Sequence, residues 1–228
     1  MKNRKMIIGI IVSVLATAAL ATGLVHSRAS SRYSDLGALY GESLKIKESK
    51  QRHDDAWIRG KHFSVSKEEF ENMVEQNEIT GMDRADAEEM AYCQFVVSRA
   101  VYGQAIDDGF LIDKDAVKAQ IDLERDAIMA SESKDSFLAY LEGAGLTEDE
   151  YWSSMYDTYL RTMTVARYTE AIREAFLEKN QPDAAAWSEY CIQITQEILK
   201  KQEIFLKDES AWSLTAENYN NSGVWPPV

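Results

Sequence analysis

The chain has 228 residues, of which 45% are hydrophobic and 28% are charged, and its 38 acidic residues outnumber 25 basic ones. This is enough for one globular domain with its own core, while three prolines and eleven glycines are few for a fold built from many tight turns. The net charge of −13 argues against nucleic acid as a partner, because sequence-independent binding to nucleic acid starts with cations that contact phosphates.

The N-terminal region predicts a membrane segment. Three basic residues among the first five precede an uncharged run at residues 6–25, and a helix of this length matches the ~30 Å hydrocarbon core at ~1.5 Å per residue. Because the flanking cations stay in the cytoplasm, we expect residues 1–26 to form a single-pass anchor in the cell membrane, with the rest of the chain extracytoplasmic. The alternative is a signal peptide that is cleaved after Ala21 or Ala29, which releases a secreted protein.

Residues 27–62 are polar and carry charges of both signs, which is typical of a stalk between an anchor and a folded body. The segment contains a possible short helix near residues 36–50. The alternative is that the segment packs back on the body through Leu36, Leu39 and Tyr40. The sequence leaves both interpretations open.

The body, residues 63–207, reads as a series of helices. Ser66 with Glu69, and Thr147 with Glu150, have the spacing of capping boxes, in which the side chains of the two residues satisfy each other's free backbone N–H groups. The predicted helices span approximately residues 66–77, 83–108, 113–130, 133–143, 148–178 and 183–207.

Little in the body suggests strands. Period-two alternation is limited to a possible strand near residues 62–65, and the tail at residues 208–228 is expected to be irregular. The predicted fold class is therefore all-α, an irregular multi-helix bundle preceded by the membrane-spanning or signal segment.

The sequence offers no recognisable catalytic or cofactor motif. It contains neither an H-E-x-x-H nor an E-x-x-H pattern for metals, and no glycine-rich phosphate-binding loop. We therefore expect no enzyme activity, no catalytic residue, no metal and no cofactor. Cys93 and Cys191 fall on two helices that are expected to pack together, so a disulfide and a pair of buried free thiols are both open.

The most distinctive feature is an aromatic–methionine stripe on the long helix predicted at residues 148–178. Its members recur at helical spacing: Trp152, Met155, Tyr156, Tyr159 and Met163. One interpretation is that the stripe is core, the usual fate of such a face. The other is that part of it lines a peptide-binding groove, together with Phe137 and Tyr140, because methionine and tyrosine suit a surface that accepts many side chains. Flanking acids would then favour basic clients.

The order of these elements resembles the N-terminal domain of SurA-type periplasmic chaperones and PrsA-type foldases, which is also similar to the peptide-binding part of trigger factor. The resemblance covers about residues 60–178, and the segments that carry it are residues 63–70, 102–113, 136–141 and 145–152. It implies binding of unfolded or exported polypeptides. Many members add a parvulin-type isomerase module after the long helix, but here only residues 180–182 separate that helix from the last one. Isomerase activity is therefore not expected.

The resulting expectation is a membrane-tethered, extracytoplasmic chaperone-like module that holds extended polypeptides in an apolar helical groove. The alternative function is that of a structural or adaptor protein that docks one specific envelope partner. The two differ in whether unrelated unfolded proteins are bound.

Overall fold

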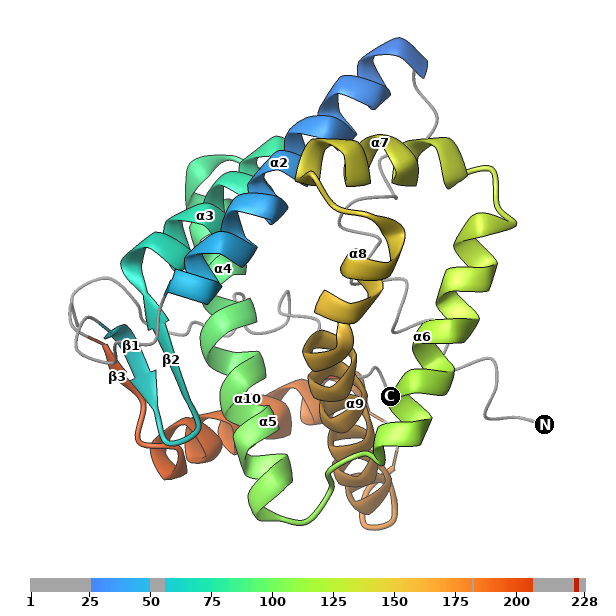
Figure 1. Ribbon diagram of the computed structural model, residues 1–228. Helices are drawn as coiled ribbons and strands as arrows, with labels where there is room; N and C mark the ends of the chain where they lie inside the picture. Colours follow the sequence, from blue (N-terminus) through green and yellow to red (C-terminus); the bar gives the residue numbers. More distant parts are fainter. Residues whose placement is uncertain (1–25, 50–55, 182, 207–223, 226–228) are drawn as a thin grey trace.

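The computed structural model describes residues 26–49, 56–181, 183–206 and 224–225, and it is mainly helical, as the sequence predicts (Figure 1). The helices are α2 (His26–Ser49), α3 (Lys67–Ile79), α4 (Arg84–Tyr92), α5 (Ser98–Asp107), α6 (Lys114–Met129), α7 (Lys134–Ala144), α8 (Glu148–Ser154), α9 (Tyr156–Leu177) and α10 (Ala184–Lys201). A π-helical turn, Cys93–Val97, connects α4 to α5. The strands are β1 (Ala56–Gly60), β2 (Phe63–Ser66) and β3 (Phe205–Leu206).

Local side-chain caps fix where the helices begin. The Ser66 hydroxyl accepts from the Glu69 backbone N–H at 3.1 Å, and the Glu69 carboxylate accepts from the Ser66 backbone N–H at 2.9 Å. Thr147 and Glu150 make the same reciprocal pair at the start of α8. Both predicted capping boxes are therefore confirmed. Three aspartates cap further helices: Asp83, Asp113 and Asp183.

Two long predicted helices are interrupted. The π-helical turn lies inside the predicted helix 83–108, and the predicted helix 148–178 divides at Met155 into α8 and α9. At the second break, the Ser154 hydroxyl donates to the Tyr151 carbonyl at 2.7 Å and lies 2.8 Å from the Tyr40 hydroxyl. A serine that bonds the preceding turn competes with helix propagation, which explains why α8 stops here.

A small antiparallel sheet in the order β2-β1-β3 flanks the helices. Ile58 of β1 pairs with Val65 of β2 and with Leu206 of β3, and the side chains of Ile58 and Val65 are fully buried. The last helix ends at Lys201 rather than near residue 207, and Glu203, with a φ of 50°, turns the chain into β3. The sequence indicated only the strand near residues 62–65.

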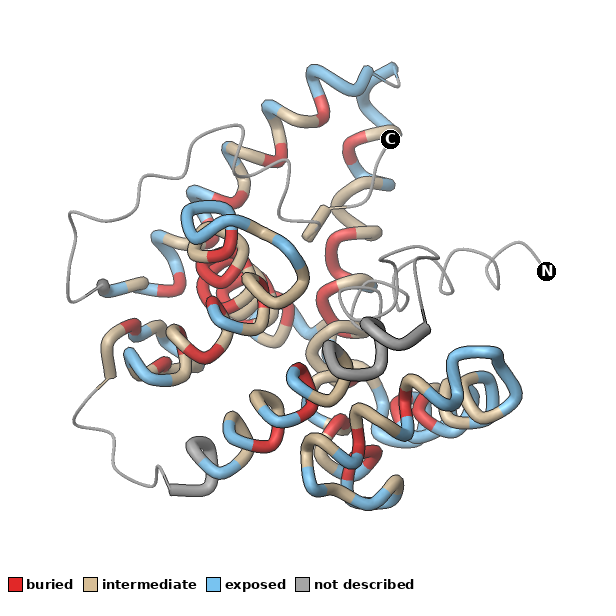
Figure 2. Tube along the Cα trace, turned by 90° about the horizontal axis from the view of Figure 1, so that it is seen from above, coloured by how far each residue is buried: buried red, intermediate tan, exposed pale blue. Residues whose placement is uncertain are grey.

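Hydrophobic side chains gather in three clusters in the described part of the chain. Figure 2 marks the buried positions along the elements. The main core lies between the sheet, α3, α4, α5 and parts of α9 and α10. A second core joins α6, α7, α8 and the start of α9, and a third joins the ends of α9 and α10. Trp225 contacts this third cluster, where its indole N–H donates to the Thr195 hydroxyl at 3.0 Å. Helix α9 thus belongs to all three cores.

Helix α2 packs against α7 and α3, so the polar segment contacts the body (Figure 1). Leu36 is buried, and the Leu39 carbonyl accepts from the Asn72 amide at 3.2 Å. Gly37 and Gly41 face the α7 backbone at a distance that leaves no room for a Cβ atom. Of the two interpretations of residues 27–62, the structure therefore shows packing on the body rather than a free stalk, for α2 and for β1.

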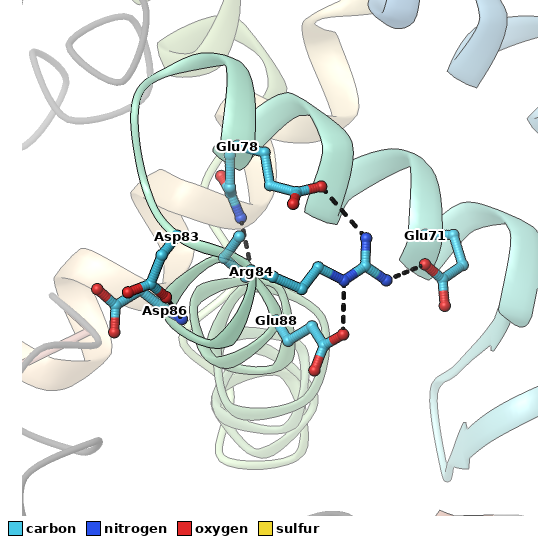
Figure 3. Close-up of polar contacts among 8 residues, drawn as sticks. Glu71, Glu78, Asp83, Arg84, Asp86 and Glu88 are labelled. Atoms are coloured by element: carbon cyan, nitrogen blue, oxygen red, sulfur yellow. Dashed lines mark hydrogen bonds and ion pairs between the residues drawn. The ribbon is translucent and has the colours of Figure 1, made fainter.

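Arg84 ties α3 to α4 at the surface (Figure 3). Its guanidinium donates to three carboxylates, those of Glu71 and Glu78 on α3 and that of Glu88 on its own helix. These hydrogen bonds raise the pKa of Arg84 above its ordinary value. Because all four side chains are partly exposed, the cluster orients the two helices but contributes little stability of its own.

Asp107, at the end of α5, holds the β1–β2 turn against α10. Its carboxylate accepts from Lys61 Nζ at 2.8 Å and from Gln202 Nε2 at 3.1 Å, and it lies 3.0 Å from His62 Nε2. The hydrogen bonds from Lys61, Gln202 and His62 lower the pKa of Asp107 to about 2, from an ordinary value of 3.8. The ionised carboxylate is therefore the form that the fold favours.

We expect this contact to make the stability of the fold depend on pH in the acidic range. A carboxyl group whose pKa is lowered by folding stabilises the fold at pH values above the pKa that it has in the unfolded chain. This contribution disappears as the pH falls from about 4 to about 2. Denaturant unfolding at several pH values should show a smaller loss of stability over this window in Asp107→Asn than in the unaltered chain. Asp126→Asn, at an exposed position of α6, is the control. Equal pH profiles for the Asp107→Asn variant and the unaltered chain would contradict the assignment.

Candidate functional site

The seven residues predicted to bind peptide come together in the second core. Four of them are buried, with exposed fractions between 4% and 6%: Trp152, Met155, Tyr159 and Phe137. The other three, Tyr140, Tyr156 and Met163, are half-buried. The stripe is therefore core over most of its length, because α6 and α7 cover it.

Tyr140 packs between helices rather than facing an open groove. Its ring lies 5.8 Å from that of Tyr40 and 6.0 Å from that of Tyr151, within the contact between α2, α7 and α8. Burial raises the pKa of Tyr140 well above its ordinary value, so the hydroxyl stays protonated. Of the predicted groove residues, Tyr156 lines an open depression of the surface.

That surface is a depression of about 970 Å³ between the C-terminal half of α2, helix α8 and the start of α9, which we call the α2–α8 depression. Its lining residues are Leu44, Leu146, Asp149, Glu150, Ser153, Ser154, Tyr156 and Asp157. Leucine and tyrosine surfaces provide apolar contact, and three carboxylates give the depression a negative rim. Two of these also have structural roles, since Asp149 pairs with Arg125 at 2.8 Å and Glu150 completes the α8 cap.

Two buried polar groups of the second core have unused hydrogen-bonding capacity, and one of them, the Tyr156 hydroxyl, belongs to a residue that lines the depression. The Trp152 indole Nε1 and the Tyr156 hydroxyl are both buried, and neither has a hydrogen-bond partner in the described part of the chain. An unsatisfied buried donor costs about 1–3 kcal/mol, so most proteins avoid it. By contrast, the indole of Trp225 is satisfied by Thr195. The Tyr156 hydroxyl is thus an unsatisfied polar group of a residue that lines the depression.

Sequence patterns did not indicate two apolar residues of the depression. Leu44 belongs to the segment interpreted as a stalk. Leu146 follows Gly145, whose φ of 67° ends α7, and its backbone N–H donates to the Leu141 carbonyl at 3.1 Å. A hydrophobic residue directly after a helix-ending glycine is a known part of this motif, and it was the available signal.

Cys93 and Cys191 are both buried, and burial raises the pKa of Cys93 to about 12, which disfavours its thiolate near neutral pH. Among the described residues, no group of three or more histidine, cysteine, aspartate or glutamate side chains is placed to hold a metal ion.

No helix in the described ranges is long and apolar enough to cross a membrane. The predicted anchor, residues 6–25, lies outside the described residues, so this prediction stays open. Comparisons with protein-family models, with curated proteins and with solved structures found no match. The similarity to SurA-type and PrsA-type domains therefore stays a prediction from sequence.

Proposed function

We propose that the chain binds extended polypeptide segments in the α2–α8 depression, as a chaperone-like module that acts without catalysis. The observation that carries this proposal is the coincidence of an open, partly apolar depression with an unsatisfied group on its lining, the Tyr156 hydroxyl. An extended polypeptide presents a backbone carbonyl at every residue, so it supplies the acceptor that this hydroxyl lacks. The resemblance to SurA-type domains supports the same class of ligand.

The chemistry of the rim suggests which segments bind best. Leu44, Leu146 and the Tyr156 ring offer apolar contact, while Asp149 and Asp157 add negative charge. Clients with apolar and basic residues are therefore favoured over acidic ones. The apolar run at residues 6–25 supports an extracytoplasmic location on the cell membrane, where exported polypeptides pass in an unfolded state.

The proposal is tested by conservative removal of the Tyr156 hydroxyl. We expect Tyr156→Phe to weaken binding of a fluorescein-labelled, unfolded peptide by about 3- to 10-fold, because the complex loses a hydrogen bond worth ~0.5–1.5 kcal/mol. Fluorescence anisotropy with the full-length chain in mild detergent measures the affinity. Trp225→Phe is the control, since that indole is already bonded to Thr195 away from the depression. Unchanged affinity in Tyr156→Phe would contradict the proposal.

The alternative function, a dedicated adaptor for one envelope partner, makes a different prediction for the same chain. A chaperone-like module suppresses aggregation of a chemically unfolded, unrelated protein at near-stoichiometric ratios, and an adaptor does not. The outward-facing leucines Leu123 and Leu138, with exposed fractions of 59% and 41%, favour the alternative as contact points for a partner.

A further inference from the structure

The C-terminal segment of the chain contacts the body through Trp225. This side chain packs against the main core and the third core, and its indole N–H donates to the Thr195 hydroxyl at 3.0 Å. Its ring also meets that of Trp187 edge-on, with centroids 6.2 Å apart. Trp225 follows Thr195 by 30 residues, and residues 207–223 lie outside the described part of the chain. A tryptophan that belongs to no helix therefore fills a site on α10.

The rings around this site also contact one another. Phe176 of α9 lies 5.1 Å from Trp187 and 5.2 Å from Tyr190, both on α10, and the centroids of Trp187 and Tyr190 are 5.9 Å apart. Phe176 and Trp187 are buried. These three residues and Thr195 form what we call the α9–α10 aromatic site. Aromatic surfaces of this kind receive the tryptophan and tyrosine anchors of protein interfaces.

The Thr195 hydroxyl gives the site a polar requirement. The buried residues of α10 recur on one face of the helix, and Thr195 is the one among them with a hydroxyl: Trp187, Cys191, Thr195 and Ile198. With Trp225 in place, Thr195 is only 1% exposed. Tryptophan combines a large apolar ring with a single N–H donor, whereas phenylalanine has no donor. The site is therefore matched to tryptophan.

The way in which Trp225 binds resembles the binding of a peptide ligand. Val224 and Trp225 belong to neither a helix nor a strand, and Trp225 is half-buried. Pro226 follows in the sequence, and a residue before proline favours an extended backbone, so less conformational freedom is lost on binding. A ligand on the same chain as its site competes at an effective concentration of about millimolar, so even a weak site is filled. Trp225 thus has the features of an internal ligand.

We propose that the α9–α10 aromatic site is a second binding site, which takes an extended, tryptophan-bearing segment of a partner polypeptide. The chain's own Trp225 occupies the site until such a segment displaces it. The site shares no residue with the lining of the α2–α8 depression, so this inference does not depend on the proposed function. A peptide without tryptophan leaves Trp225 in place, which keeps Trp225 a valid reference for binding in the depression.

The test uses a fluorescein-labelled peptide with the sequence of residues 221–228 and the full-length chain in mild detergent. Trp225→Ala vacates the site, so we expect this variant to bind the peptide about tenfold more tightly than the unaltered chain, in which the attached tryptophan competes. A peptide with phenylalanine at the tryptophan position should bind Trp225→Ala about tenfold more weakly, because it lacks the donor to Thr195. Equal affinity of the two chains for the tryptophan peptide would overturn the inference.

Variants at Thr195 in the Trp225→Ala background locate the bound peptide. Thr195→Val keeps the shape but removes the acceptor, so it should abolish the tenfold preference for tryptophan over phenylalanine. Thr195→Ser is the matched control and should retain the preference. Because the preference compares two peptides on one protein, a partly unfolded sample does not change it. A preference that survives Thr195→Val would overturn the assignment to this site.

The unaltered chain provides a test that needs no substitution in the site. Excess unlabelled peptide should displace Trp225 and move its indole N–H resonance, in the 15N-labelled chain, toward the position of free tryptophan. A resonance that stays in place at millimolar peptide would overturn the inference. Sedimentation of the unaltered chain checks a different occupant. Dimerisation that Trp225→Ala abolishes would assign the site to the tail of a second copy and overturn the assignment to a partner polypeptide.

Discussion

Replacing Trp152 by alanine is expected to lower the free energy of unfolding by about 3–5 kcal/mol, because the indole fills the second core and a large cavity would remain. Its ring contacts those of Phe137 and Tyr151, with centroids 5.8 Å and 5.0 Å away. Trp152→Phe keeps an aromatic ring in this cluster and should cost much less. Thermal or denaturant unfolding measures the difference.

The matched control is Leu123→Ala on α6, whose side chain is 59% exposed and should change stability by no more than about 0.5 kcal/mol. A Trp152→Ala variant that unfolds at nearly the same denaturant concentration as the unaltered chain would contradict the assignment to the core. The result also decides how the binding site is probed, since loss of binding in an alanine variant that unfolds says nothing about the depression.

Gly37→Ala is expected to destabilise the chain by about 2 kcal/mol, although alanine is the better helix former. Helix propensity alone predicts a gain of about 1 kcal/mol for this change. The added Cβ, however, would lie 2.0 Å from the Tyr140 carbonyl oxygen and 2.9 Å from the Ala144 nitrogen, both backbone atoms of α7. Helices α2 and α7 would have to separate, and overpacking of this kind costs about 1–3 kcal/mol or more.

The direction in which Gly37→Ala changes the unfolding temperature is the test. Glu42→Ala, at an exposed position of α2, is the control and should leave the unfolding temperature nearly unchanged. A higher unfolding temperature in Gly37→Ala would mean that α2 is not held against α7, and that the segment behaves as the stalk that its composition suggests.

Local signals made the helix starts predictable. The Ser66 and Thr147 capping boxes and the Asp113 cap depend on residues within three positions of each other, so the sequence contains the whole interaction. The end of α8 was not predictable in this way. The Ser154 hydroxyl that bonds the Tyr151 carbonyl also lies 2.8 Å from the hydroxyl of Tyr40, which is 114 residues away in the chain.

The same difference between local and long-range contacts explains which features of the candidate site the sequence predicts. The helical spacing of Trp152, Met155 and Tyr159 correctly predicted that these side chains share a face. Whether the face is core or groove depends on α6 and α7, which cover it in the folded chain. The packing of α2 depends on Gly37 and Gly41, and glycines mark a close helix contact only when the partner helix is known.

The indole N–H resonances of the full-length, 15N-labelled chain test the proposed binding site most directly. Trp152→Phe and Trp225→Phe assign the two signals. On titration with the unfolded peptide, the Trp152 resonance should shift in a saturable way, because Trp152 packs in the same core as Tyr156, whose hydroxyl gains an acceptor, while that of Trp225 stays in place. A Trp152 signal that does not move while peptide binding reaches saturation would contradict the account and place the binding surface elsewhere.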